Sequence, residues 1–166
     1  MQQFVRDVLW GDLDYLIVDL PPGTGDAQLS LAQTISITGG VIVTLPQQVS
    51  LEDARRGLEM FRQLDIPIIG VVENMSYLEL PDGQIMDVFG TGGGEKMAEA
   101  AQVGFLGTVP MDPAVREGGD NGKPIAITRP DSKVTEALKN LSVLTALEAG
   151  LIALKSQQET LSIKIS

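Results

Sequence analysis

Asp19 and Gly23 are the residues whose types and spacing first suggest chemistry. Apolar residues fill positions 15–18, Asp19 follows them, and the turn PPGTG comes directly afterwards. A carboxylate at the end of a buried strand can hold Mg²⁺ through water, and a glycine N–H can approach a phosphate oxygen because no side chain blocks it. This spacing is typical of a nucleotide site. A plain strand-to-helix turn, capped by Asp26, explains it equally well, so both interpretations stay open at this point.

A phosphate-binding P-loop, GxxxxGK[ST], does not occur in the sequence. Pro124 follows the Gly-Lys pair at residues 122–123 and offers no hydroxyl group for Mg²⁺. In the other glycine-rich stretch, residues 90–96, Glu95 separates glycine from lysine. A dinucleotide site is also disfavoured, because the third glycine of GxGxxG would fall on Gln28.

The composition excludes several classes of site. The chain of 166 residues contains neither cysteine nor histidine, so it supplies no thiolate nucleophile, imidazole base or cysteine-ligated cluster. A net charge of −10 disfavours a nucleic-acid surface, which needs clustered cations. No apolar run approaches the ~20 residues of a membrane span, so we expect no membrane partner and a cytoplasmic location. The length predicts a single domain over residues 1–166.

Alternating strands and helices must position these residues. Apolar runs predict strands at residues 15–19, 41–45, 68–72 and 105–109, and helical spacing predicts helices at residues 1–10, 27–35, 50–64, 95–102 and from 132 onward. Strands that are apolar at nearly every position are covered on both faces. The fold class is therefore α/β, with a mainly parallel sheet flanked by helices. The leucines at residues 134–154 either fill the core or bind a partner.

Several stretches of the chain are similar to the Mrp/ApbC family of P-loop ATPases. They are DYLIVDLPPGTGD, TLPQQVSLEDARRGLEMF, GVVENMSY, FGTGGGEK and VPMDPAVREGGDNGKPI, and they follow the family's order from residue 14 to residue 125. The resemblance implies a P-loop NTPase fold like that of the MinD and ArsA ATPases. It also implies ATP and Mg²⁺ as ligands, a homodimer, and a role as carrier or scaffold for iron–sulfur clusters, with client or assembly proteins as partners.

The resemblance also assigns roles to particular residues. Asp19 matches the Walker-B-like aspartate that binds Mg²⁺, and Gly23 belongs to the switch loop that reports on the γ-phosphate. Asn74 matches the asparagine that recognises adenine. Pro110 and Asp112 match the segment that closes over the base from the other side.

The sequence departs from the family pattern in two places. The P-loop and its strand, which in the family precede residue 14, do not occur, so we expect a C-terminal part of a longer protein that binds ATP weakly and does not hydrolyse it alone. The apolar strand at residues 15–19 would lack that neighbour, and we expect self-association or packing of the terminal helix over the gap. Where many members carry a CxxC pair after NMSY, this chain has LELPDGQIMDVFG, so we expect no cluster there.

Two other functions stay open. One is a MinD- or ParA-like positioning ATPase, although the acidic charge argues against a DNA surface and the sequence shows no basic amphipathic terminal helix. The other is a non-catalytic interaction module in which residues 134–154 form a partner-binding or dimer helix.

Overall fold

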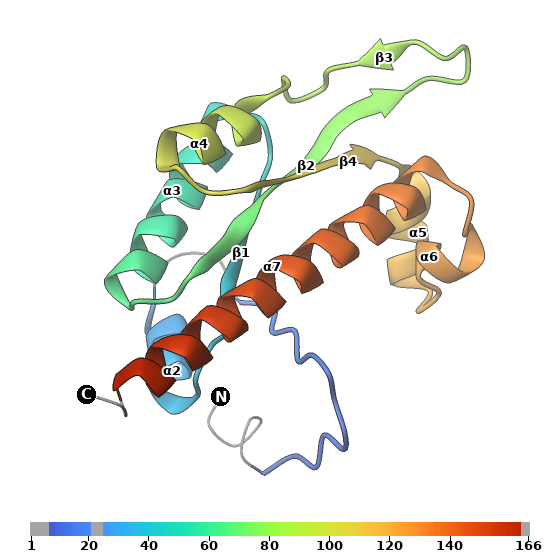
Figure 1. Cartoon of the computed structure of the whole chain (residues 1–166). Helices are drawn as coiled ribbons and strands as arrows, with labels where there is room; N and C mark the ends of the chain where they lie inside the picture. Colours follow the sequence, from blue (N-terminus) through green and yellow to red (C-terminus); the bar gives the residue numbers. More distant parts are fainter. Residues whose placement is uncertain (1–6, 21–24, 164–166) are drawn as a thin grey trace.

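The computed structural model describes residues 7–20 and 25–163, which form a sheet with helices on both faces (Figure 1). The sheet contains four strands, β1 (Gly40–Thr44), β2 (Ile68–Glu79), β3 (Ile85–Met86) and β4 (Phe105–Met111). β2 pairs in parallel with β1 on one side and with β4 on the other, and its far end pairs antiparallel with β3. The predicted α/β class with a mainly parallel sheet is confirmed.

Helices cover the sheet in two layers. They are α2 (Asp26–Thr34), α3 (Gln48–Gln63), α4 (Gly93–Ala101), α5 (Pro113–Asp120), α6 (Ile125–Thr128) and α7 (Lys133–Ile163). α3 and α4 pack on one face of the sheet, where Leu58, Phe61 and Met97 are buried. α6 and α7 pack on the other face through Ile125 and Val134.

The middle strand explains why the core divides in this way. Successive side chains of a strand point to opposite faces, and Val71 belongs to the cluster under α3 and α4 while Val72 belongs to the cluster under α7. Both valines are buried, as a parallel strand between two helical layers requires. At the start of β1, Gly40 is needed for close packing, since a Cβ atom there would lie 2.3 Å from the Phe61 ring.

The predicted strand at residues 15–19 is wrong. These residues belong to no strand, and Leu16, Ile17 and Val18 are exposed, Ile17 by 88%. An apolar segment becomes a stable central strand only where neighbouring strands satisfy its backbone and helices cover its faces. No described strand pairs with this segment, and β1 itself pairs only with β2 among the described residues. Of the helix predicted at residues 1–10, positions 1–6 lie outside the described residues and positions 7–10 are not helical.

The starts of two helices also differ from the prediction. α3 begins at Gln48, two residues before the predicted start at residue 50, and Gln47 is its N-cap residue. α2 begins at Asp26, so Gly25 is its N-cap residue and Asp26 is not the cap. A shift of one residue is enough to move a capping side chain out of reach of the free N–H groups.

β2 is longer than the sequence suggested, because it continues into a hairpin with β3. Its parallel register with β4 is interrupted between Asn74 and Leu78, next to Met75, whose φ is 51°. In the turn of this hairpin, Asp82 Oδ1 accepts a hydrogen bond of 3.1 Å from the Gln84 N–H.

α7 divides its apolar residues between two sides. Val134 and Ala149 are buried against the sheet, whereas Leu144, Leu147 and Leu151 are exposed. The helix continues without a break through Gly150. Contrary to the sequence-based expectation, the helix from Lys133 to Gln158 is long and apolar enough to cross a membrane by length and composition. The side that packs on the sheet is part of the protein core.

Replacing Leu58 tests the layer formed by α3. Leu58 is 2% exposed and lies in the cluster beneath α3. We expect Leu58→Ala to lower the free energy of unfolding by about 2–5 kcal/mol, because it removes buried methyl groups and leaves a cavity. Urea unfolding measures this loss. Val49→Ala is the control, since Val49 lies on the same helix but is largely exposed, and equal losses in the two variants would contradict the packing described.

Candidate functional site

Polar residues meet where the parallel strands end. Thr44 closes β1 and lies opposite Glu73 of β2, which in turn lies opposite Thr108 of β4. One residue further along β2, Asn74 lies opposite Val109. The carboxyl ends of parallel strands form the edge at which open α/β sheets bind ligands.

Glu73 is fully buried and joins this edge to α4. Its Oε1 accepts hydrogen bonds from the Ser76 hydroxyl, at 2.5 Å, and from the Gly92 N–H, at 3.1 Å. Its Oε2 accepts from the Gly94 N–H at 2.6 Å. Because Gly92 and Gly94 lie at the start of α4, the carboxylate satisfies N–H groups that a helix leaves unpaired and faces the positive end of its dipole.

The glycines of residues 90–94 are explained by this contact. A Cβ atom on Gly94 would lie 2.9 Å from the Glu73 Cβ, so a side chain there would force the two elements apart. Gly92 has a φ of 71°, a conformation that glycine adopts without strain. Sequence reasoning placed Glu73 at a strand end but gave it no role. The available signal was a glutamate inside an apolar strand, followed by a glycine run at a helix start.

Asn74 projects from the same edge and is half-buried. Its Oδ1 accepts a hydrogen bond of 3.0 Å from the Met75 N–H. The left-handed backbone of Met75 interrupts the ladder with β4 at this point. The side-chain amide is therefore held by the chain's own backbone next to the end of the sheet.

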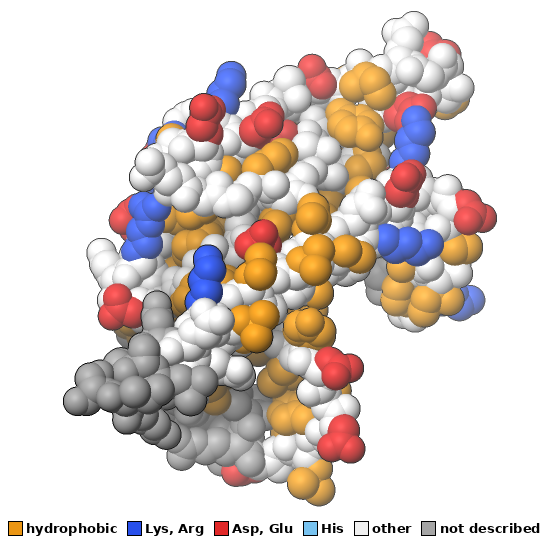
Figure 2. All heavy atoms as spheres, in the orientation of Figure 1, with side chains coloured by type: hydrophobic (Ala, Val, Ile, Leu, Met, Phe, Trp, Pro, Cys, Tyr) orange, Lys and Arg blue, Asp and Glu red, His pale blue; other side chains and the backbone are white. Residues whose placement is uncertain are grey.

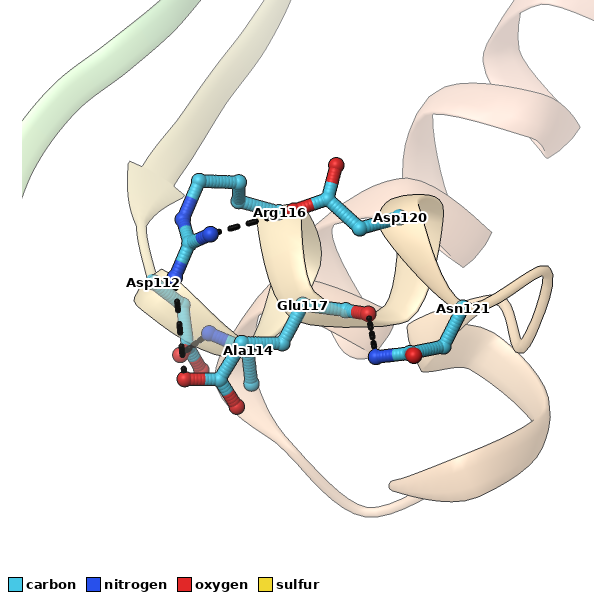
Figure 3. Close-up of polar contacts among 6 residues, drawn as sticks. All are labelled: Asp112, Ala114, Arg116, Glu117, Asp120 and Asn121. Atoms are coloured by element: carbon cyan, nitrogen blue, oxygen red, sulfur yellow. Dashed lines mark hydrogen bonds and ion pairs between the residues drawn. The ribbon is translucent and has the colours of Figure 1, made fainter.

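Pro110 and Asp112 lie at the end of β4, where the chain enters α5. Pro110 is buried, and Asp112 is the N-cap residue of α5, with its Oδ1 accepting a 2.8 Å hydrogen bond from the Ala114 N–H (Figure 3). Further along α5, Arg116 forms an ion pair with Asp120 at 3.0 Å. Asp112 thus has a structural role as a helix cap, whatever ligand it also contacts.

A cavity of about 340 Å³ opens beside this turn. It is lined by the end of β2, the turn after it, the end of β4 and the start of α7: Leu78, Glu79, Leu80, Pro81, Pro110, Met111, Asp112, Pro113, Lys133 and Val134. A hydrogen bond from the Lys133 ammonium to the Glu79 carboxylate raises the pKa of Lys133 above its usual value. The wall of the cavity therefore carries the Lys133–Glu79 ion pair, and Asp112 also lines it.

Some of the predicted site residues lie close together in the structure, and others do not. Asn74, Pro110 and Asp112 lie at the ends of adjacent strands. Asp19 is exposed and belongs to no strand, so the predicted strand-end position is not observed, and its metal-binding role stays a prediction. Gly23 lies outside the described residues. Within the described ranges, no group of three or more acidic residues is arranged to hold a metal ion.

The arrangement is that of an open α/β sheet with polar residues at its carboxyl edge, the edge at which such sheets bind ligands. The family described as ParA, NUBPL iron-transfer P-loop NTPase, matches residues 1–145. The chain belongs to this family, which confirms the family resemblance found in the sequence.

Relatives of known name support the same assignment. A protein of Synechocystis is 52% identical over 157 residues, and one of Deinococcus radiodurans is 48% identical over 164 residues. Both are named iron-sulfur cluster carrier protein. The matches cover 93% and 98% of this chain but 44% and 46% of those proteins, so the chain spans about half the length of the relatives it matches.

Solved structures confirm the fold. A nucleotide-binding protein of Archaeoglobus fulgidus in complex with ADP is 34% identical, with a TM-score of 0.69 over 81% of this chain and 55% of that one. The septum site-determining protein MinD of Pyrococcus horikoshii, complexed with Mg-ADP, has a TM-score of 0.64 at 23% identity and covers 84% of this chain and 53% of its own. The second likeness concerns the fold alone.

Replacing Glu73 tests the junction between β2 and α4. In Glu73→Gln the size of the side chain is kept, but an amide NH₂ faces N–H groups that need an acceptor. We expect a loss of about 2–3 kcal/mol in unfolding free energy, because a buried hydrogen bond to a charged acceptor is lost and a donor stays unsatisfied. Urea unfolding measures the loss. Glu99→Gln, at an exposed position of α4, is the control, and similar curves for both variants would show that Glu73 does not join the two elements.

Proposed function

We propose that the chain is the adenine-binding part of an ATP-dependent iron–sulfur cluster carrier. The observation that carries the proposal is the family match over residues 1–145, combined with relatives about half identical that bear the carrier name. The geometry agrees with a nucleotide role, because the residues predicted for the base lie together at the carboxyl edge of the sheet.

The residues present fit an adenine base. The Asn74 amide carries both a donor and an acceptor, which is the pairing that the edge of adenine requires, and its orientation is fixed by the contact with Met75. Pro110 follows Val109, which lies opposite Asn74, so the two predicted residues belong to the same end of the sheet. The ADP complex of the Archaeoglobus protein, a relative at 34% identity, supports this use of the edge.

The phosphate side of the site rests on Asp19 and Gly23. We propose that Asp19 holds Mg²⁺ through water and that Gly23 contacts the γ-phosphate, as the family resemblance implies. The exposed position of Asp19 means that this segment would need a neighbouring strand to reach a sheet edge. Because the sequence contains no P-loop to bind the phosphates, we expect weak ATP binding and no ATP turnover above a blank by the 166-residue chain.

The iron–sulfur cluster is cargo in this proposal. The chain has no cysteine and no histidine, so it offers none of the thiolate or imidazole ligands on which clusters depend. The ligands would therefore come from outside these 166 residues. A homodimer and a cytoplasmic location are further parts of the proposal, and both rest on the family resemblance and the composition.

The alternative of a positioning ATPase is not favoured. Its support is the likeness to MinD, which at 23% identity concerns the fold. The third possibility, an interaction module, is compatible with the nucleotide proposal, because the exposed leucines of α7 do not line the cavity at the strand ends.

Asn74→Ala tests the base site. We expect the variant to bind ADP about three- to tenfold more weakly, since it loses hydrogen bonds to the base. We also expect it to lose the preference of the unaltered chain for ADP over GDP. Chemical-shift titration measures both affinities, even for a weak site. Asn140→Ala, at an exposed position of α7, is the control. Equal affinities for ADP and GDP in the unaltered chain would contradict adenine recognition by this edge.

Anaerobic reconstitution with iron and sulfide tests the cargo assignment. We expect the purified chain to show no stoichiometric iron and no cluster absorbance after desalting, because it lacks thiolate ligands. Iron analysis and visible absorption measure this. A stable cluster in stoichiometric amount would overturn the view that the ligands come from outside these 166 residues.

A further inference from the structure

The β2–β3 hairpin projects from the body of the molecule. Figure 1 shows it extending past the other strands, and Figure 2 shows it as a projection of the surface in the same orientation. Residues 81–88 at its end are all exposed, and β3, which pairs with β2, is two residues long. A two-stranded hairpin is by itself marginally stable in water. The position of this hairpin therefore depends on what holds its base.

An ion pair joins the base of the hairpin to the start of α7. The Lys133 Nζ atom lies 2.5 Å from Oε2 of Glu79, the last residue of β2. These two residues are 54 positions apart in the sequence. Every other ion pair between described residues joins neighbours within α3 or within α5. In the described part of the chain, the Lys133–Glu79 pair is thus the one that links two separate parts of the fold.

The start of α7 provides a fixed anchor for this ion pair. Val134 and Thr135 follow Lys133 directly, and their exposed fractions are 2% and 0%. The Thr135 hydroxyl donates a hydrogen bond of 2.8 Å to the Arg129 carbonyl oxygen. The Lys133 side chain itself is 66% exposed, so it can be replaced without opening the core. When the ion pair breaks, the hairpin is therefore the part that moves.

Met75 provides a hinge between the hairpin and the rest of the sheet. Its φ of 51° is uncommon for a residue other than glycine. The parallel pairing of β2 with β4 is interrupted between Asn74 and Leu78, and beyond this break Leu78 pairs with Met111. A short second stretch of pairing thus holds the hairpin to β4, and a rotation at Met75 leaves the central part of the sheet intact.

The hairpin also forms one wall of the cavity at the carboxyl edge. Residues 78–81 line this wall, and residues 110–113 and the start of α7 line the other walls. We propose that the hairpin is a hinged lid on this cavity, which turns at Met75 and is held closed by the Lys133–Glu79 ion pair. This inference rests on the proposed function for one point, the nucleotide as the ligand whose binding the lid regulates.

The hinge residue is also the residue that holds the Asn74 side chain. The Met75 N–H donates a hydrogen bond of 3.0 Å to Asn74 Oδ1, so a rotation at Met75 moves the amide proposed to bind the base. Opening of the lid therefore weakens the base site. By linkage, a bound base stabilises the closed lid to the same extent.

Distances between two spin labels test the lid, because the chain has no cysteine of its own. Gln84→Cys in the hairpin and Asn140→Cys on α7 place both labels at exposed positions. We expect a narrow distance distribution in the otherwise unaltered chain and a broader one in Lys133→Met. Lys139→Met is the matched control, since Lys139 lies on the same helix and donates to the Pro130 carbonyl oxygen. Equal distributions with and without Lys133, or the same broadening in the control, would overturn the proposal.

Exchanging the two charges separates the ion pair from other effects of substitution. Glu79→Lys alone should broaden the distance distribution, because two lysines then repel each other at the base of the hairpin. Adding Lys133→Glu should restore the narrow distribution, since opposite charges meet again. A distribution that stays broad in the double variant would show that the ion pair does not hold the lid.

Amide hydrogen exchange tests the link between the lid and the base site. We expect the Met75 N–H to exchange about two- to fivefold faster in Lys133→Met, as the loss of an exposed ion pair favours local opening by that factor. The Val71 N–H, which donates to the Gly104 carbonyl oxygen in the central sheet, is the internal reference and should not change. Unchanged exchange at Met75 would overturn the link. Neither measurement uses a nucleotide, so its failure overturns the lid alone, whereas equal binding of ADP and GDP overturns adenine recognition alone.

Discussion

The buried carboxylate of Glu73 is the contact on which the arrangement at the carboxyl edge depends. It lies on the middle strand and accepts hydrogen bonds from two backbone N–H groups at the start of α4 and from the Ser76 hydroxyl. A buried carboxylate is stable only where hydrogen bonds replace its water. The strand end, the glycine run and the helix start are therefore fixed together. Asn74 follows Glu73 directly, so the position of its amide is fixed by the same contact.

Local patterns were sufficient for most of the fold. The apolar runs at residues 68–72 and 105–109 are strands between two helical layers, as their composition indicates, and the run at residues 41–45 is a strand paired with β2 although Val43 on it is exposed. The run at residues 15–19 has the same composition and is not a strand. An apolar composition indicates that a segment can form a buried strand. Whether it does so depends on whether another strand lies beside it and forms hydrogen bonds with its backbone. The hairpin of β3 was also missed, because its short strand is defined by contact with β2.

For the site, too, the sequence indicated some of the residues and missed others. Asn74, Pro110 and Asp112 were assigned through the family resemblance, and the structure places them at the ends of adjacent strands. Glu73 received no role because its partners, Gly92 and Gly94, are distant in the sequence. The glycine run was first compared with a phosphate cradle, and its real cause is the close approach of that glutamate. The exposure of the leucines on α7 could not be predicted either, since helical spacing alone does not say which side faces the sheet.

The unpaired side of β1 has a consequence for how the chain behaves before it meets any partner. Within the described residues this strand hydrogen-bonds on one side, and Val43 on it is exposed. The unpaired N–H and C=O groups of a strand edge can form hydrogen bonds with any extended segment. The correct register is selected by the alternation of side chains, because a slip by one residue would turn every side chain of the added strand to the wrong face of the sheet. Correct assembly and fibrillar aggregation therefore compete for the same row of N–H and C=O groups, and protein concentration determines which one is faster.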